Sequence, residues 1–349
     1  MSEISRVGVD LAKQVIQVHG VDAHGTSVSR RALARKSFLD WCAKLPGGCV
    51  VVMEACTGSH YWARQLGRIG LQVRLIAPHL VAPYRMQGRS GKNDANDAAA
   101  VCEAGGRPQM HFVPIKTVEQ QGVLSVHVTR QGCEKDRTAC INRIRALLAE
   151  FGIAVPVGPQ KLRLQLAEIV EDGSNELPGV TRQAIQRLTQ QWRNLDDDIA
   201  WCDQQITRHA RSDPRARSAQ ALLGVGPLGA SALVASVADF AQFKSGSQLA
   251  CWLGITPSQH SSGGKPRLGR ITKHGDTYLR TLLVNGARTA IQNSKPRDER
   301  VWRWAHELSA RIGWQKAAVA LAAKNARILW AMFTKGEDFV PNHVSAKPA

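Results

Sequence analysis

The chain has 349 residues, enough for two or three domains, and its 44% hydrophobic content is typical of a globular protein. Lys and Arg (46) outnumber Asp and Glu (28), and the net charge of +18 indicates a polyanionic partner, with nucleic acid first and a membrane surface as the alternative. We find no basic amphipathic anchor, no apolar stretch that could span a bilayer and no signal peptide, so we expect a cytoplasmic protein without a membrane partner.

The first part of the chain alternates short apolar runs with helical stretches. The run from Cys49 to Met53 lacks polar alternation, which is typical of a strand buried on both faces. A hairpin-led sheet followed by crossover helices predicts an α/β domain of the ribonuclease H-like kind. The expected strands are 6–10, 15–18, 26–31, 49–53 and 71–76, and the expected helices are 36–44, 59–69 and 92–104.

Four carboxylates fall at strand ends or at a helix start in this domain. Asp10 ends the first strand and Glu54 ends the buried strand, while Asp94 and Asp97 share one face of the alanine-rich helix. Glu54 taken alone is better explained as a solvated strand-end residue. The carboxyl ends of strands are where open α/β sheets carry their chemistry, so the four together favour a functional site.

A long helical region follows. Residues 117–151 contain no proline and predict one helix, which the glycines and prolines of 152–159 end. A second helix is predicted at 181–211, with a coiled-coil seam along one side. The seam residues are Ile185, Leu188, Trp192, Leu195, Ile199, Cys202 and Ile206. Two interpretations stay open: a hairpin within the chain, or a dimerisation arm.

From about residue 219 the chain is nearly all helical, with further helices expected at 276–292, 297–312 and 314–333. The segment from Leu222 to Ala230 resembles a helix-hairpin-helix element. The glycines of its turn, among them Gly226 and Gly229, would present backbone N–H groups to a phosphate. The alternative is a plain tight turn between two helices, and the net positive charge favours DNA.

A long loop rich in glycine, serine and basic residues is predicted at 254–275, and long ordered loops are usually functional. Ser261 and Ser262 precede a Gly-Gly pair, which would let a nucleic-acid backbone approach a hydroxyl closely. The alternative, which spacing alone favours, is a flexible basic loop without chemistry. The basic residues expected to contact nucleic acid are Lys92, Lys265, Arg267, Arg270, Lys273 and Arg280.

Clustered carboxylates in a basic protein suggest bound Mg²⁺ or Mn²⁺, because Mg²⁺ prefers oxygen ligands and is held by a few carboxylates plus substrate phosphates. Two such ions roughly 4 Å apart can stabilise the attacking and leaving oxygens of a phosphoryl transfer, which describes a nuclease. A serine nucleophile would change the reaction class, because a protein–DNA ester keeps the bond energy for a second DNA hydroxyl. Ser262 lies in another domain from the carboxylates, so the working site would be composite.

Taken in order, these motifs resemble those of a bacterial insertion-sequence transposase family with a DEDD signature. The signature corresponds to Asp10 in Val-Gly-Val-Asp-Leu-Ala-Lys, Glu54 in Met-Glu-Ala-Cys-Thr-Gly, and Asp94 with Asp97 in Lys-Asn-Asp-Ala-Asn-Asp-Ala. The domain that carries it resembles the Holliday-junction resolvase RuvC. Leu-Leu-Gly-Val-Gly-Pro-Leu-Gly, Trp252-Leu-Gly-Ile-Thr-Pro and the Ser-Ser-Gly-Gly-Lys loop resemble the family's C-terminal transposase domain.

The resemblance, which covers about residues 4–333, implies a site-specific DNA recombinase that moves its own element through a phosphoserine intermediate. It implies an Mg²⁺ site at the four carboxylates and a nucleophile directly before a glycine, which is Ser262, with the adjacent Ser261 as the alternative. It further implies a structured guide RNA from the element's non-coding flank, and a tetramer. The seam independently suggests a homo-oligomer, dimer to tetramer, and the DNA substrate suggests association with the nucleoid.

We therefore divide the chain into a RuvC-like catalytic domain (1–112), a coiled-coil linker and oligomerisation region (113–215), a C-terminal transposase domain with the serine loop (216–335) and a disordered tail (336–349). Two rival functions stay open. A RuvC-like structure-specific endonuclease acting through a metal-activated water would need the carboxylates but not Ser262. A non-catalytic nucleic-acid-binding scaffold would need neither.

Overall fold

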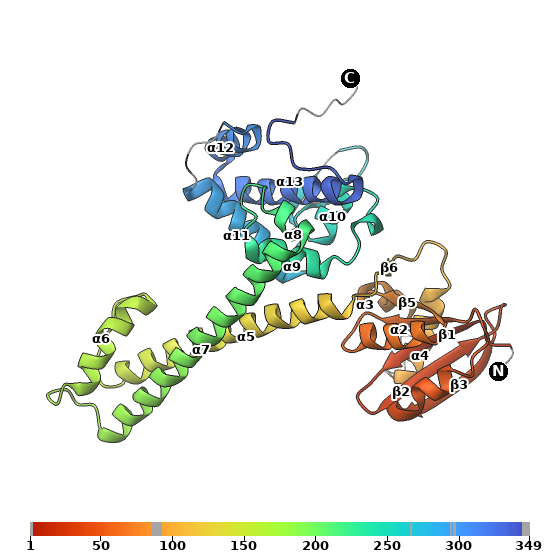
Figure 1. Ribbon diagram of the computed structural model, residues 1–349, viewed down its shortest axis with the longest axis horizontal. Helices are drawn as coiled ribbons and strands as arrows, with labels where there is room; N and C mark the ends of the chain where they lie inside the picture. The colour runs from red at the N-terminus through yellow and green to blue at the C-terminus, as the bar shows by residue number, and fades with distance from the viewer. Residues whose placement is uncertain (1–2, 86–92, 266, 294, 296–297, 344–349) are drawn as a thin grey trace. The chain divides into compact units, whose positions relative to one another are not determined.

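The computed structural model describes residues 3–85, 93–265, 267–293, 295 and 298–343, which form two compact units, Met1–Thr117 and Val118–Ala349 (Figure 1). The first unit is mixed α/β and the second is mostly helical, as predicted. Over the described ranges, no helix combines the length and the apolar character needed to cross a membrane.

A six-stranded mixed sheet forms the centre of the first unit. Its spatial order is β3-β2-β1-β4-β5-β6, in which β1, β4 and β5 are parallel and the other neighbouring pairs are antiparallel. The five predicted strands are confirmed, and the third extends three residues past Arg31. The strands are β1 (Arg6–Leu11), β2 (Val15–Val21), β3 (Ser27–Ala34), β4 (Val50–Glu54), β5 (Gln72–Ile76) and β6 (Phe112–Val113).

Helices cover both faces of this sheet. Val51 and Met53 of β4 are buried with the residues of α1 and α2, whereas Val52 is buried with those of α4. The prediction that this strand is buried on both faces is therefore confirmed. The helices are α1 (Phe38–Cys42), α2 (Ser59–Arg68), α3 (Pro78–Val81) and α4 (Asp94–Gly105), with 3₁₀ turns η1 (Arg35–Ser37) and η2 (Ala82–Tyr84).

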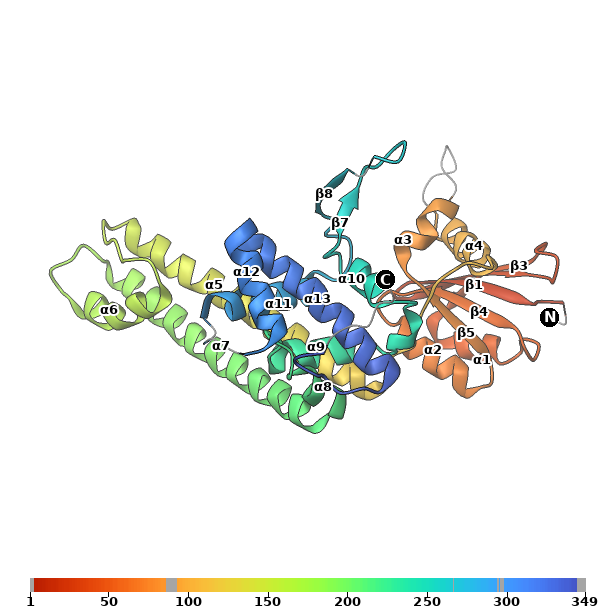
Figure 2. The same ribbon diagram turned by 90° about the horizontal axis from the view of Figure 1, so that it is seen from above.

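An antiparallel helical hairpin begins the second unit. It consists of α5 (Val118–Ala149) and α7 (Gly179–Ser212). Helix α6 (Pro159–Glu171) packs at the end of the hairpin where α5 finishes and α7 begins (Figures 1 and 2). The seam of α7 is buried inside this hairpin: Ile185 and Trp192 share a core with Ile144 of α5. The intramolecular alternative is therefore confirmed, and dimerisation stays a prediction.

The remaining helices share one hydrophobic core. Its central helix is α9, in which six consecutive residues from Ala230 to Ala235 are buried, as expected of a helix that is apolar on every side. The elements are α8 (Pro214–Ala219), α9 (Pro227–Ser236), η3 (Phe240–Gln242), α10 (Gly246–Trp252), α11 (Thr277–Asn293), α12 (Arg300–Ile312) and α13 (Trp314–Lys335). Beyond α13, Phe339 packs against this core, and residues 344–349 of the predicted tail lie outside the described residues.

A buried polar group joins the hairpin to this core. The Ser231 hydroxyl of α9 hydrogen-bonds His127 of α5 (3.0 Å) and His209 of α7 (2.9 Å), and the other ring nitrogen of His127 lies 2.9 Å from the Tyr278 hydroxyl. Burial lowers the pKa of His127 to about 4, so the ring is neutral near pH 7. Neutral histidines can both donate and accept, which satisfies every member of this group without a buried charge.

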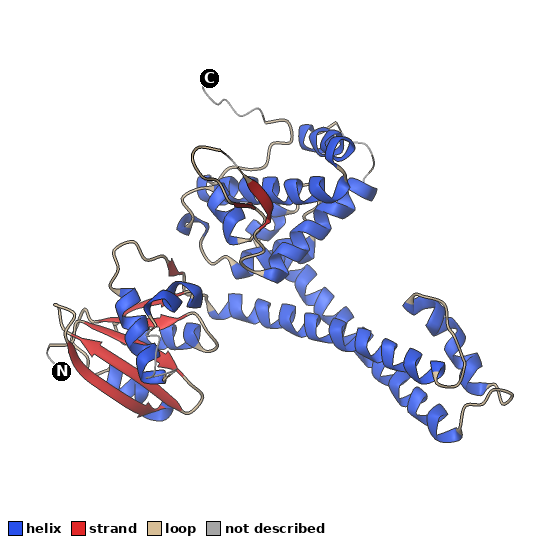
Figure 3. Ribbon diagram, turned by 180° about the vertical axis from the view of Figure 1, so that it is seen from behind, coloured by secondary structure: helices blue, strands red, loops and turns tan. Residues whose placement is uncertain are grey.

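The prediction of a long loop at 254–275 is wrong in one respect. The segment contains a two-stranded hairpin, β7 (Pro257–Gln259) and β8 (Leu268–Ile271) (Figures 2 and 3). Its turn consists of Gly263 (φ +57°) and Gly264 (φ +76°). Two consecutive residues with positive φ form the tight turn that matches strand twist, and glycine adopts this conformation without strain. The short strands carry no hydrophobic alternation, so periodicity did not reveal them.

Candidate functional site

Two neighbouring strands place the first pair of carboxylates. In the parallel pairing of β1 with β4, Val9 lies opposite Met53. Asp10 and Glu54 are the next residues on the two strands, so both lie at the carboxyl edge of the sheet. Glu54 is only 14% exposed as a side chain, so its charge is poorly hydrated and needs a counter-charge nearby.

Helix α4 places the second pair. The Asn93 side chain caps the helix by accepting the N–H of Ala95 (3.0 Å), which sets Asp94 and Asp97 in its first turn. Carboxylates are stabilised there by the helix dipole. The helix lies directly on β1 at Gly8, where an added Cβ would be 2.2 Å from the carbonyl oxygen of Ala98.

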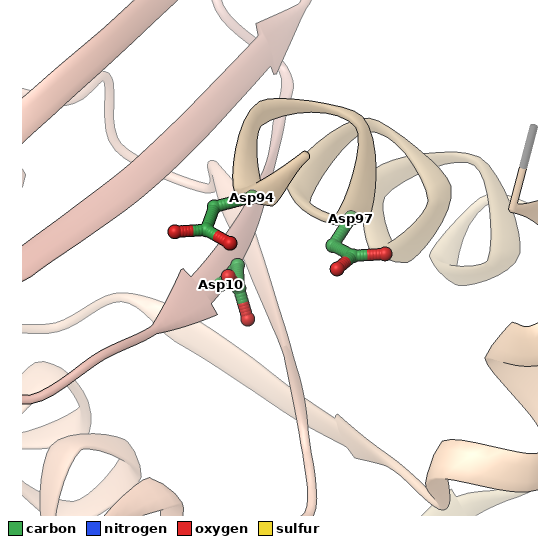
Figure 4. A group of neighbouring side chains, drawn as sticks. All are labelled: Asp10, Asp94 and Asp97. Atoms are coloured by element: carbon green, nitrogen blue, oxygen red, sulfur yellow. The ribbon is translucent and has the colours of Figure 1, made fainter. Parts of the chain in front are cut away.

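These packing contacts bring three of the four predicted carboxylates together. Asp10, Asp94 and Asp97 each have a carboxylate oxygen within 4.8 Å of the others (Figure 4). Figure 4 shows Asp10 at a strand end and the other two projecting from one helix. Such a group of oxygen donors matches the preference of Mg²⁺ and Mn²⁺, and all-oxygen sites disfavour softer metals.

Glu54 joins this group through Arg85, a residue that the sequence analysis did not single out. The Arg85 guanidinium donates from Nη2 to Oε1 of Glu54 (2.6 Å) and from Nε to Oδ1 of Asp97 (3.0 Å). Burial raises the pKa of Glu54, Arg85 opposes this shift, and the charges of Asp10 and Asp97 raise the pKa further. The carboxylates therefore fit a cationic group, and the arginine already occupies part of that role.

The two serines of the other predicted site lie near the tip of the β7–β8 hairpin. The Ser261 hydroxyl accepts the backbone N–H of Arg267 (2.9 Å) and an N–H of the Gln259 side chain (3.3 Å), so it holds the two arms together. Ser262 begins the Gly-Gly turn, and its carbonyl accepts the N–H of Lys265 (3.1 Å). Across the described residues the Ser262 hydroxyl has no hydrogen-bond partner, and the residue is exposed.

Most of the predicted nucleic-acid contacts that the structure describes are exposed side chains, and one is held by hydrogen bonds. Lys265, Arg267 and Arg270 are exposed on the hairpin, and Lys273 is exposed just after it with a positive φ of 56°. Arg280 instead donates to the carbonyl of Leu253 (3.3 Å) and to the Thr277 hydroxyl (3.0 Å), so its guanidinium supports the base of the hairpin. Lys92 lies outside the described residues.

The glycines of the predicted helix-hairpin-helix have different surroundings. Gly224, with φ +82°, lies against α11, where a Cβ would be 2.7 Å from the carbonyl of Gly286. This close approach explains Gly224 through packing. Gly226 precedes α9 and Gly229 lies in its first turn, and a Cβ at either would meet nothing within 4 Å. Packing does not require these two glycines, so a role in approaching a phosphate stays a prediction.

The chain is similar to known transposases over most of its length. A DEDD transposase model matches residues 7–153, and the model described as "Transposase IS116/IS110/IS902 family" matches residues 216–303. The chain is 45% identical to the "Probable family 20 transposase" of Pseudomonas aeruginosa, over 97% of this chain and 99% of the relative. It is 38% identical to the "Transposase for insertion sequence element IS1111A" of Coxiella burnetii (97% and 92%) and 34% identical to the "Transposase for insertion sequence element IS1328" of Yersinia enterocolitica (97% and 99%). The chain therefore belongs to the IS116/IS110/IS902 family of transposases, enzymes that cut and rejoin DNA.

Proposed function

We propose that the protein recombines DNA at the ends of an insertion sequence, using a divalent-metal site at Asp10, Glu54, Asp94 and Asp97 and a serine nucleophile, Ser262. The convergence of carboxylates from β1, β4 and α4 at one edge of the sheet carries this proposal. The strand order, with an antiparallel hairpin leading into parallel β1, β4 and β5, supports a ribonuclease H-like, RuvC-like assignment for the first unit.

The carboxylates would hold Mg²⁺ or Mn²⁺, which when bound stabilises the developing charge on the attacking and leaving oxygens of a phosphodiester. Lys265, Arg267 and Arg270 would bind the DNA backbone beside Ser262, because exposed guanidinium and ammonium groups bind phosphate without reading sequence. Low exposure of Glu54 (14%) and Asp97 (16%) keeps their charges from being fully hydrated, which strengthens their attraction for a cation.

Ser262 would attack the phosphorus through Oγ. The Oγ–P bond forms as the bond from phosphorus to a deoxyribose oxygen breaks, and the serine proton ends on that oxygen, which leaves as a hydroxyl. A hydroxyl of a second DNA strand then attacks the same phosphorus and releases the serine, so strands are exchanged without an energy-rich cofactor. Among the described residues the Ser262 hydroxyl has no hydrogen-bond partner, whereas the Ser261 hydroxyl accepts two, and this difference supports the choice of nucleophile.

The nucleophile is tested with matched variants of neighbouring serines. We expect Ser262→Ala to abolish both strand exchange and the covalent protein–DNA adduct seen on a denaturing gel. Ser261→Ala should retain the adduct, although it removes two hydrogen bonds within the hairpin. An adduct lost only in Ser261→Ala would reassign the nucleophile. Metal-dependent cleavage without an adduct in the wild type would instead indicate an endonuclease that uses water.

The metal site is tested independently of the serine. We expect Asp94→Asn combined with Asp97→Asn to abolish both Mn²⁺ binding, measured by isothermal titration calorimetry, and DNA cleavage, because two oxygen ligands lose their charge. The Ser262→Ala variant should bind Mn²⁺ as the wild type does. Unchanged Mn²⁺ binding in the aspartate variant would refute the proposed site.

A guide RNA, an oligomer of two to four chains and action at the nucleoid are also part of the proposal. The net charge of +18 supports binding of both DNA and RNA. Expression together with the non-coding DNA that flanks the gene, followed by sequencing of the co-purified RNA, tests the guide. One discrete structured RNA would support it, and random cellular RNA would exclude it. Light scattering of the purified complex gives the number of chains.

A further inference from the structure

Arg85 is placed inside the carboxylate site rather than beside it. Its guanidinium bridges Glu54 at the end of β4 and Asp97 in the first turn of α4, with contacts of 2.6 Å and 3.0 Å. Asp97 also has a carboxylate oxygen within 4.8 Å of those of Asp10 and Asp94. One arginine therefore connects the fourth carboxylate to the group formed by the other three.

Electrostatics explains why a cation is required at this position. Glu54 and Asp97 are only 14% and 16% exposed as side chains, so water screens their mutual repulsion poorly. A planar guanidinium can donate to two carboxylates at once, which a compact ammonium does less well. Arg85 itself is 40% exposed, so its side chain has access to solvent if its partners are taken by another cation.

We propose that Arg85 is the resident counter-cation of this site and competes with the divalent ion for Glu54 and Asp97. An ion bound through all four carboxylates has to share or displace the guanidinium, so Arg85 weakens metal binding while it stabilises the metal-free protein. This inference rests on the proposed metal function of the same carboxylates. According to this inference, Arg85, which is not one of the four carboxylates, controls the concentration of divalent metal at which the site fills.

Titration of the full-length protein with MnCl₂ by calorimetry, with melting curves in the absence and presence of Mn²⁺, tests this competition. We expect Arg85→Ala to bind Mn²⁺ about three- to tenfold more tightly than the wild type, a modest effect because the arginine is partly exposed. Without metal, Arg85→Ala should melt at a lower temperature than the wild type, and Mn²⁺ should raise its melting temperature by more. Arg85→Lys should give intermediate values for both quantities.

Arg68→Ala serves as the matched control, because this arginine is exposed on α2 and, within the described residues, its side chain hydrogen-bonds only Gln65 of the same helix. It lowers the net charge equally and should leave Mn²⁺ affinity unchanged. If the wild type binds Mn²⁺ and the folded Arg85→Ala variant binds it equally or more weakly, the proposed competition is overturned and the metal site is not. Absence of Mn²⁺ binding in both proteins would refute the metal site and this inference together.

Discussion

Gly8 is the point at which the carboxylate site depends on backbone packing. Gly8 lies in β1, two residues before Asp10, and α4 crosses it so closely that no side chain fits between them. A Cβ on Gly8 would be 2.2 Å from the carbonyl oxygen of Ala98, and 2.4 Å and 2.5 Å from the backbone nitrogen and Cβ of Cys102. These are mainly backbone atoms, so a change of rotamer cannot relieve the clash.

Gly8→Ala should therefore push α4 away from β1 by roughly 1 Å. Overpacking of this kind costs about 1–3 kcal/mol in the free energy of unfolding. In hydrogen–deuterium exchange, this loss corresponds to roughly 5- to 150-fold faster exchange of those α4 amides that exchange only when the whole unit unfolds. Asp94 and Asp97 move with the helix, so Mn²⁺ affinity should fall about 10- to 100-fold, as when a supporting contact of a metal site is lost.

Gly20→Ala is the control, on the adjacent strand β2. A Cβ at Gly20 would be 3.3 Å from Cβ of Ser29 and 3.4 Å from the Ile4 side chain, so small adjustments accommodate it. We expect its effect on α4 exchange and on Mn²⁺ affinity to be negligible. Wild-type exchange and wild-type Mn²⁺ affinity in Gly8→Ala would refute the argument that this glycine sets the distance between α4 and Asp10.

Three further predictions concern the second unit. Its stability should fall as pH drops from 6.5 to about 4, because His127 has its pKa lowered from 6.5 to about 4 and the unfolded chain takes up the proton first. His127→Gln should flatten the plot of melting temperature against pH between pH 6.5 and about 4. An unchanged plot would contradict the assignment of this pH dependence to His127. Ile144→Ala should lower the free energy of unfolding by about 2–5 kcal/mol, measured by urea unfolding with tryptophan fluorescence, because this side chain of α5 is fully buried in the core shared with α6 and α7. A loss below about 1 kcal/mol would contradict this packing. Asp213→Ala should cost about 0.5–2 kcal/mol by calorimetry, because its carboxylate accepts the N–H groups of Arg215 (2.8 Å) and Ala216 (3.1 Å) at the start of α8, and Asp213→Asn should restore most of the loss.

The elements that sequence reasoning located well are those with a local physical cause. The run from Cys49 to Met53 is apolar throughout because both faces of β4 are covered, and this requirement is visible in the sequence. The seam of α7 is visible for the same reason, since its three-four spacing places Ile185 and Trp192 on the buried side. The β7–β8 hairpin was missed because its four-residue strand and its three-residue strand bury little apolar surface.

The carboxylate site shows where local reasoning ends. Sequence reasoning placed Asp10 and Glu54 at the ends of strands, and the structure has Glu54 as the last residue of β4 and Asp10 one residue before the end of β1. It also placed Asp94 and Asp97 together in the first turn of a helix, because strand ends and helix caps depend on neighbouring residues. That these carboxylates meet follows from the folded chain and not from local sequence. Strand pairing of β1 with β4 and the contact of α4 with Gly8 join segments that lie more than forty residues apart, as Gly8 and Val52 do. The role of Arg85 was decided in the same way, because a single charged side chain has no periodicity and finds its partners only when the chain has folded.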